Sequence, residues 1–175
     1  MRKVCSLVIL TGAFGSAVLA QNGGSASVSA EMKQAYATVK NNILKSAEKV
    51  PDADYSFKPT PEIRSFAEVL AHVADSQART CSAISGEHAQ ANAAGKTSKA
   101  DIIAALQAAF AVCDKAYDSL TDSNASEAIT TPRGQRTKIG ALAGNLSHDS
   151  EQYGIMSVYM RLKNIVPPSS DRSGR

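Results

Sequence analysis

Four stretches of the sequence repeat apolar side chains every three or four residues, which is the period of an amphipathic α-helix. Three of them span about residues 29–49, 65–85 and 137–163. The clearest repeat lies in residues 98–120 and consists of Ile103, Leu106, Phe110, Cys113, Tyr117 and Leu120. No segment has a convincing strand pattern, so the sequence predicts an all-α fold, a four-helix bundle.

Side chains that cap helix N-termini stand at the start of two of these stretches. Ser65 is followed three residues later by Glu68, which is the spacing of a capping box. The second helix is therefore expected to begin at Ser65 or one turn earlier. Ser98 and Asp101 have the same spacing and predict the start of the third helix.

The connections between the helices contain residues that interrupt helices. Residues 50–63 include three prolines and predict an extended segment. The polar stretch 121–139 contains Pro132 and Gly134 and predicts a loop with a short turn at residues 132–134. The helices should therefore be joined by irregular segments rather than by strands.

The first twenty residues have the features of a secretory signal peptide. Arg2 and Lys3 precede a run of apolar and small residues, and Val18 and Ala20 suit a cleavage site after Ala20. A membrane anchor is the alternative, but the run is short, interrupted by glycines and followed by polar residues. The sequence predicts an exported protein, secreted or periplasmic, with no membrane association after cleavage.

The mature chain is expected to form one domain. Residues 1–20 would be the signal peptide, 21–28 a flexible N-terminus, 29–166 the helical bundle and 167–175 a flexible tail. Removing the two basic residues of the signal peptide from the 19 in the chain leaves 17, against 16 acidic residues. This balance, without a basic cluster interleaved with aromatic residues, argues against nucleic acid as a partner.

Two of the three histidines fall on predicted helices. His72 lies at the border of the apolar stripe of the second helix, and His148 lies on the fourth helix with Gln152 one turn later. Metal ligands in bundles project inward from facing helices, so these histidines suit one site. Taken alone, however, helical histidines are more commonly ordinary hydrogen-bonded side chains. His88 lies in the loop 86–96, and no role is predicted for it.

Two segments resemble the signature segments of the DinB family. Residues 52–75 resemble its lead-in of tyrosine, proline and arginine to a histidine-bearing helix. Residues 140–170 resemble its His-x-x-x-His-x-Gly helix, which is followed by Tyr-x-Arg and Pro-Pro-Ser-Ser. The resemblance implies a bundle of up-down-down-up topology in which three histidines bind one divalent metal, zinc or nickel. It implies no DNA chemistry.

Carried over to this chain, the ligand positions of the family fall on His72, His148 and Gln152. Gln152 departs from the pattern, because the family places a third histidine there. An amide oxygen suits zinc or nickel less well than an imidazole nitrogen does. Asp75 and Glu151 each stand three residues after a histidine, so either carboxylate is a candidate partner that orients an imidazole.

The resemblance leaves two functions open. An open metal site activates water or a thiolate, which predicts a metal-dependent enzyme acting on a small molecule by hydrolysis or by thiol or group transfer. The missing third histidine instead favours a non-catalytic bundle with a degenerate metal site, acting as a binding or stress-related protein. The exposed ends of such bundles also permit a homodimer.

Cys81 and Cys113 remain after signal cleavage, and in an exported protein they form either a disulfide or two buried thiols. The topology implied by the resemblance makes the second and third helices parallel. Cys81 then lies sixteen residues from Ser65 and Cys113 fifteen from Ser98, so the two would be nearly level. We therefore predict a disulfide between them.

Overall fold

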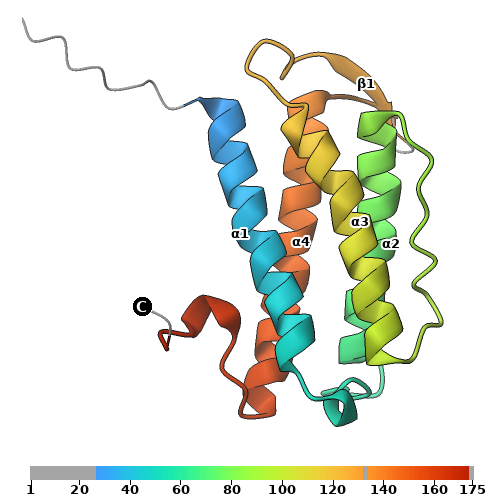
Figure 1. The fold of residues 1–175 in the computed structure, drawn as a ribbon, viewed down its shortest axis with the longest axis vertical. Coiled ribbons are helices and arrows are strands. Elements are labelled where there is room, and N and C mark those ends of the chain that lie inside the picture. Colours follow the sequence, from blue (N-terminus) through green and yellow to red (C-terminus); the bar gives the residue numbers. More distant parts are fainter. Residues whose placement is uncertain (1–26, 132–133, 174–175) are drawn as a thin grey trace, which may run out of the picture.

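Four long helices make up most of the residues that the computed structural model describes, 27–131 and 134–173. They lie side by side along one axis (Figure 1). Their bounds are α1 (Val28–Lys49), α2 (Phe66–Ser85), α3 (Lys99–Asp118) and α4 (Lys138–Leu162). The predicted four-helix bundle is therefore confirmed, while the predicted signal peptide, residues 1–20, lies outside the described residues.

The helices have up-down-down-up topology. In Figure 1, α1 and α4 descend while α2 and α3 ascend, so α2 and α3 are parallel neighbours. The crossover that makes this arrangement possible, residues 86–98, runs back along α2. Gly86 ends α2 with a φ of 74°, a left-handed conformation that glycine adopts without a Cβ clash.

The predicted helix caps are present. The Ser65 hydroxyl accepts a hydrogen bond from the Glu68 amide at 3.2 Å, and the Glu68 carboxylate accepts one from the Ser65 amide at 2.6 Å. Ser98 caps α3 by accepting from the Asp101 amide at 3.1 Å. Short 3-10 helices follow α1 and α4, as η1 (Asp52–Asp54) and η2 (Pro168–Ser170).

A short β-hairpin corrects the strand-free loop predicted for residues 121–139. Strands β1 (Ala128–Thr131) and β2 (Gly134–Thr137) pair antiparallel. β1 alternates only between exposed and half-buried residues and β2 is exposed throughout, so neither strand has the alternation of buried and exposed residues by which a strand is recognised in sequence. The hairpin lies beside the end of α2 and the start of α4 (Figure 1). It therefore closes one end of the interface between these helices.

The core between the helices is aromatic on the α1–α3 side. The rings of Tyr36 and Tyr117 stack with centroids 3.8 Å apart, and Phe110 packs beside Tyr36. Ile102 is completely buried, whereas the predicted core residue Ile103 is only partly buried. At the first turn of α3, the buried face is therefore rotated slightly relative to the predicted apolar stripe.

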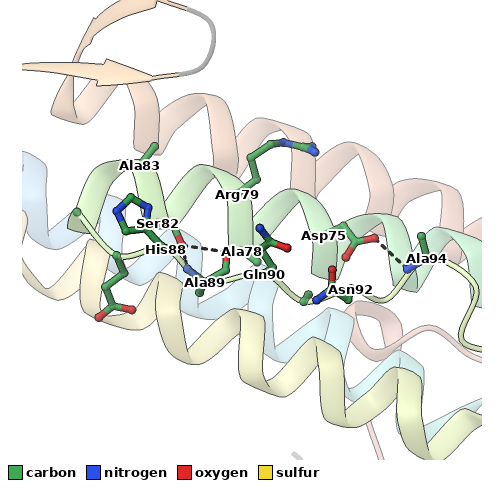
Figure 2. A pocket seen from close by; sticks show the side chains of 13 residues that line it. Asp75, Ala78, Arg79, Ser82, Ala83, His88, Ala89, Gln90, Asn92 and Ala94 are labelled. Carbon is green, nitrogen blue, oxygen red and sulfur yellow. Dashed lines mark hydrogen bonds between the residues drawn. The ribbon is translucent and has the colours of Figure 1, made fainter.

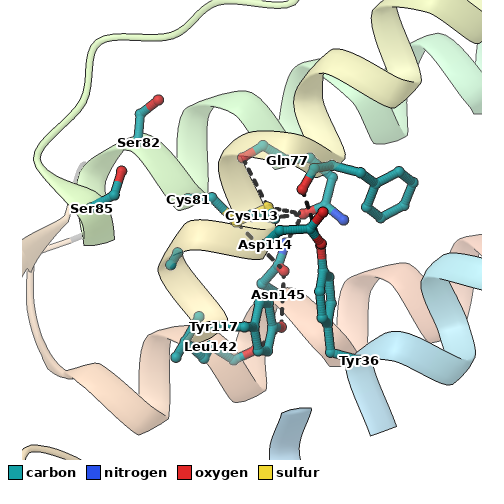
Figure 3. The surroundings of a disulfide bond; sticks show 12 residues. Tyr36, Gln77, Cys81, Ser82, Ser85, Cys113, Asp114, Tyr117, Leu142 and Asn145 are labelled. Carbon is teal, nitrogen blue, oxygen red and sulfur yellow. Dashed lines mark hydrogen bonds between the residues drawn. A yellow bond between two sulfur atoms is a disulfide. The ribbon is translucent and has the colours of Figure 1, made fainter. Parts of the chain in front are cut away.

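Cys81 and Cys113 form a disulfide that joins α2 to α3 (Figure 3). Their Cα atoms are 4.9 Å apart and both side chains are completely buried. The predicted pairing is confirmed, and it fits an oxidising compartment, where disulfides persist. No helix in the described ranges is both long enough and apolar enough to cross a membrane.

Candidate functional site

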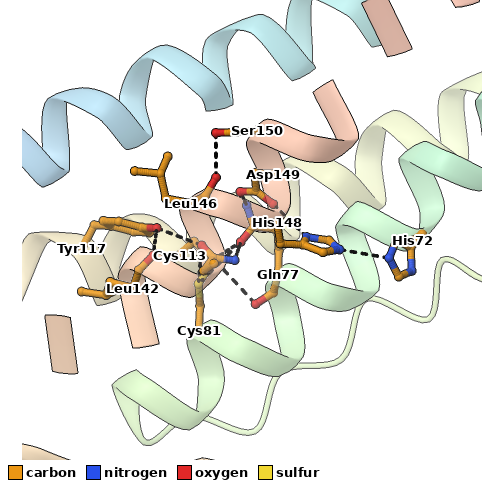
Figure 4. A network of polar contacts seen from close by, with 11 residues as sticks. His72, Gln77, Cys81, Cys113, Tyr117, Leu142, Leu146, His148, Asp149 and Ser150 are labelled. Atoms are coloured by element: carbon orange, nitrogen blue, oxygen red, sulfur yellow. Dashed lines mark hydrogen bonds and ion pairs between the residues drawn. A yellow bond between two sulfur atoms is a disulfide. The ribbon is translucent and has the colours of Figure 1, made fainter. Parts of the chain in front are cut away.

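The two helical histidines meet across the interface of α2 and α4. The Nε2 atoms of His72 and His148 are 3.0 Å apart, and their ring planes are inclined by 62° (Figure 4). Both side chains are half-buried. Two lone pairs repel each other at this separation, so either one ring donates a hydrogen bond to the other or both bind a common cation. The predicted convergence of the two rings on one point is thus a feature of the fold.

The surroundings of His72 favour its neutral form. Burial lowers the pKa of this imidazole, and the positive charges of Arg64, Arg79 and a protonated His148 lower it further. Asp75 opposes the shift with its negative charge. A neutral imidazole has a nitrogen lone pair available for a hydrogen bond or for a metal ion.

A buried carboxylate that the sequence reasoning missed lies next to His148. The Oδ1 atom of Asp149 is 3.4 Å from Nδ1 of His148, and its Oδ2 atom accepts a hydrogen bond from Nε2 of Gln77 at 2.5 Å. Asp149 is completely buried, and burial raises its pKa, while the hydrogen bonds from His148 and Gln77 oppose that shift. A carboxylate at Nδ1 favours the tautomer that leaves Nε2 free toward His72.

The sequence contains a signal for Asp149. It belongs to a series on α4 with alternating spacings of three and four, namely Leu142, Asn145, Asp149, Gln152 and Met156, and all five are buried. A carboxylate at a core position of a helix needs a buried partner. Asp149 can therefore be identified from the sequence, but the helix that supplies its partner cannot.

The two carboxylates proposed from the sequence lie elsewhere. Both oxygens of Asp75 accept backbone hydrogen bonds from the crossover, one from the Ala93 amide at 2.8 Å and one from the Ala94 amide at 3.0 Å. Figure 2 shows the bond from Ala94. Asp75 thus fastens the crossover to α2. Glu151 is exposed. His88, for which no role is predicted, borders the open groove between α2 and the crossover.

Gln152 is buried, with 5 % of its surface exposed, and its Oε1 atom has no hydrogen-bond partner in the described residues. It is the one buried side-chain nitrogen or oxygen there without a partner. An unpaired buried oxygen destabilises a fold by about 1–3 kcal/mol, so its presence in a native structure calls for an explanation. Gln152 lies one turn from His148 on α4.

The structure thus brings two imidazole nitrogens together, from His72 and His148, and leaves one buried amide oxygen, from Gln152, one turn further along α4. Within residues 27–131 and 134–173, no three His, Cys, Asp or Glu side chains converge as metal ligands. The amide is neutral, so a divalent ion would be held less firmly here than by three imidazoles.

The family of the chain follows from comparison with known proteins. The model of the DinB superfamily matches residues 35–156, which include both helical histidines and Gln152. The chain belongs to the DinB superfamily. The resemblance noted in the sequence is thereby confirmed.

Among solved structures, a DinB-like protein from Bacillus cereus ATCC 10987 is similar to this DinB chain, with a TM-score of 0.64 and 15% sequence identity. The match covers 78% of this chain and 93% of that one. At this identity the likeness concerns the fold alone. Comparison with curated proteins gave no match.

Proposed function

We propose that this DinB-superfamily protein is exported and acts on a small molecule, by hydrolysis or by thiol or group transfer, with a divalent metal at His72, His148 and Gln152. The observation that carries the proposal is the 3.0 Å separation of the two imidazole Nε2 atoms. Two nitrogens that bind one zinc ion tetrahedrally stand about 3.3 Å apart. The rings would need to separate by only a few tenths of an ångström.

Three further features of the site support metal binding. Gln152 offers a buried oxygen without a partner in the described residues. The lowered pKa of His72 keeps a nitrogen lone pair available at neutral pH. Asp149, held by Gln77, accepts from Nδ1 of His148, and metal-binding histidines commonly have such a carboxylate behind them.

A divalent ion with an open coordination position lowers the pKa of a bound water or thiol, and this is the chemistry that it would supply. The chain itself contributes the arrangement around it. Asp149 fixes the tautomer of His148, and Gln77 fixes Asp149. The two imidazoles are half-buried, so part of each ring stays accessible to a ligand. Zinc and nickel are among the ions that imidazole nitrogens bind well.

The proposal is tested by titrating metal-free mature protein with zinc and with nickel in a calorimeter. Wild type should bind one ion, and His72→Ala and His148→Ala should each lose that binding. His88→Ala is the matched control, because His88 lies in the crossover groove and should leave affinity unchanged. If wild type and the His72→Ala/His148→Ala double variant bind metal alike, the site is not the one proposed.

A second function is favoured by a specific observation. A separation of 3.0 Å is also an ordinary hydrogen-bond distance, so the two imidazoles can satisfy each other without a metal. With a glutamine in place of the third histidine, the bundle would then be a non-catalytic binding or stress-related protein. Absence of metal binding, together with a loss of stability in His148→Ala, would favour this alternative.

Export is part of the proposal and is supported by the buried Cys81–Cys113 disulfide. N-terminal sequencing of protein recovered from the periplasm or the medium should begin at Gln21. A full-length chain retained in the cytoplasm would contradict export without affecting the proposed metal site.

A further inference from the structure

A small pocket of about 100 Å³ continues the α2–α4 interface from the histidine pair toward the hairpin. Its walls come from both helices and both strands, and none of the side chains is acidic. The lining residues are Ser76, Arg79, Thr80, Thr131, Arg136, Ala141, Gly144, Asn145 and His148. A polar pocket with two guanidinium groups and no carboxylate has a positive potential.

Arg136 lies over a glycine surface of α4. A Cβ atom at Gly144 would stand 3.7, 3.8 and 4.0 Å from Nη1, Nη2 and Cζ of Arg136, so the guanidinium lies across this position. Its Nη2 atom donates to the Gly140 carbonyl at 3.0 Å. Gly140, Gly144, His148 and Gln152 follow one another at intervals of four, so they form one stripe on α4. The Arg136 guanidinium therefore lies one turn before His148 on that stripe.

Arg79 approaches from α2. Its side chain points away from the crossover segment in Figure 2 and borders both the crossover groove and this pocket, and its charge helps to lower the pKa of His72. Arg79 and Arg136 are both exposed, and no carboxylate of the described residues pairs with either. Two accessible guanidinium groups without a counter-ion border one pocket.

We infer that Arg79 and Arg136 bind the carboxylate group of the small molecule on which the protein acts. A guanidinium offers paired N–H donors that match the two oxygens of a carboxylate. The hydroxyls of Ser76 and Thr80 line the same pocket and supply further donors. The pocket volume suits one carboxylate group and the first atoms of a chain.

The spacing along the helices sets the length of the ligand. Gly144 precedes His148 by four residues, and Ser76 follows His72 by four on the antiparallel partner helix. Four residues of helix rise about 6 Å. A carboxylate held between the arginines would thus place an atom three to five bonds away at the histidine pair. The ligand class is a short-chain carboxylic acid, and this inference rests on the proposed function for what reacts at that atom.

The test uses butyrate and its neutral counterpart butyramide as probes on metal-free, full-length mature protein. Binding is followed by NMR through the side-chain Nε–H signals of the arginines. Butyrate should bind at least about tenfold more tightly than butyramide, because only the carboxylate pairs with the guanidinium groups. The signals of Arg79 and Arg136 should shift, and that of Arg161, at the other end of α4, should not.

Variants separate specific recognition from general charge. Arg79→Gln and Arg136→Gln should each weaken butyrate binding by about tenfold, and the double variant should abolish it. Arg136→Lys should also weaken it, because lysine keeps the charge but loses the paired donors. Arg161→Gln, whose arginine bonds Ser170 far from the pocket, is the matched control and should bind butyrate as wild type does.

Equal binding of butyrate and butyramide, or unchanged butyrate binding in the double arginine variant, would overturn the inference. Tighter binding of inorganic phosphate than of butyrate would overturn the choice of a carboxylate. His72→Ala separates the two proposals, because it removes a proposed metal ligand but does not line the pocket, so it should retain butyrate binding. Butyrate binding without metal binding in wild type would refute only the proposed metal site, and the reverse would refute only this inference.

Discussion

Two polar layers lie side by side in the α2–α4 interface, and they differ in how completely their hydrogen bonds are made. In the first, Gln77 accepts from Asn145 at 2.7 Å and donates to Asp149 at 2.5 Å. The Tyr117 hydroxyl completes it, 3.0 Å from Oδ1 of Asn145 (Figures 3 and 4). Every buried side-chain nitrogen and oxygen named here has a partner.

The second layer contains His72 and His148, and Gln152 lies one turn further along α4. Its two imidazoles are half-buried and lie nitrogen to nitrogen, and the Gln152 oxygen has no partner in the described residues. A complete buried network fixes a fold, whereas an incomplete one costs free energy unless a ligand completes it. Polar residues on the same helices therefore satisfy one another in one layer and leave a buried acceptor unpaired, among the described residues, beside the next.

The largest effect should come from breaking the complete layer. Gln77→Leu removes the donor to a buried carboxylate and the acceptor for Asn145, so it should destabilise the protein by about 3–5 kcal/mol. The measurement is urea unfolding of the oxidised protein. Gln152→Leu is the matched control, because it removes an oxygen without a partner in the described residues and should leave stability unchanged or raise it by up to about 1–3 kcal/mol. Equal losses from the two substitutions would remove the distinction between the layers.

The second-largest effect on stability should come from removing the disulfide, which lies beside the complete layer. It closes a loop with a sequence separation of 32 residues, and the chain-entropy account gives about 3–4 kcal/mol for a loop of that length. Cys81→Ala/Cys113→Ala should lose about that much in urea unfolding. Wild type unfolded with a reductant present should match the variant. A variant as stable as the oxidised wild type would show that packing around the cysteines, rather than the covalent link, holds α2 against α3.

Completing the second layer should strengthen metal binding. Gln152→His supplies an imidazole nitrogen in place of an amide oxygen, so the affinity for zinc should rise by about tenfold or more. Calorimetric titration of the two proteins measures this directly. Unchanged or weaker affinity would mean that the side chain at position 152 does not face the histidine pair.

The sequence was sufficient for the parts of this structure that repeat. The apolar periods and the Ser65–Glu68 capping box predicted the helices of the bundle. Once the resemblance gave the topology, the similar heights of Cys81 and Cys113 on their helices predicted the disulfide. The hairpin was missed because its two strands have only four residues each and none of them is buried, which leaves no apolar pattern to recognise. Asp149 was missed because a carboxylate is expected at the surface until its partner is known.

The pairing of Arg79 and Arg136 at the pocket could not be predicted from the sequence either. Arg136 comes from a strand that the sequence did not predict, and Arg79 from the exposed side of a helix. Only the antiparallel packing of α2 and α4 beside the hairpin brings them to one pocket with His148. Contacts between elements far apart in sequence are set by tertiary packing, which single-helix periodicity does not encode.

The smallest effect concerns the start of α2, one turn before His72 and outside both layers. This effect should depend on pH. The pKa of Glu68 is lowered to about 2, first by the hydrogen bond from the Ser65 backbone amide and then by Lys58, 3.1 Å away. Because the folded-state pKa of Glu68 lies below the usual value near 4.3, the stabilisation by its carboxylate is complete above that value and is lost as the pH falls toward 2.

Glu68→Gln keeps the shape of the capping side chain without the charge. Wild type should melt about 1–2 °C higher than Glu68→Gln at pH 7, and the difference should vanish near pH 2. Amide exchange should quicken in the first turn of α2 of the variant and stay unchanged around Gln77, since the complete layer lies two turns further along. A difference in melting temperature that persists at pH 2 would assign the effect to packing of the side chain rather than to its charge.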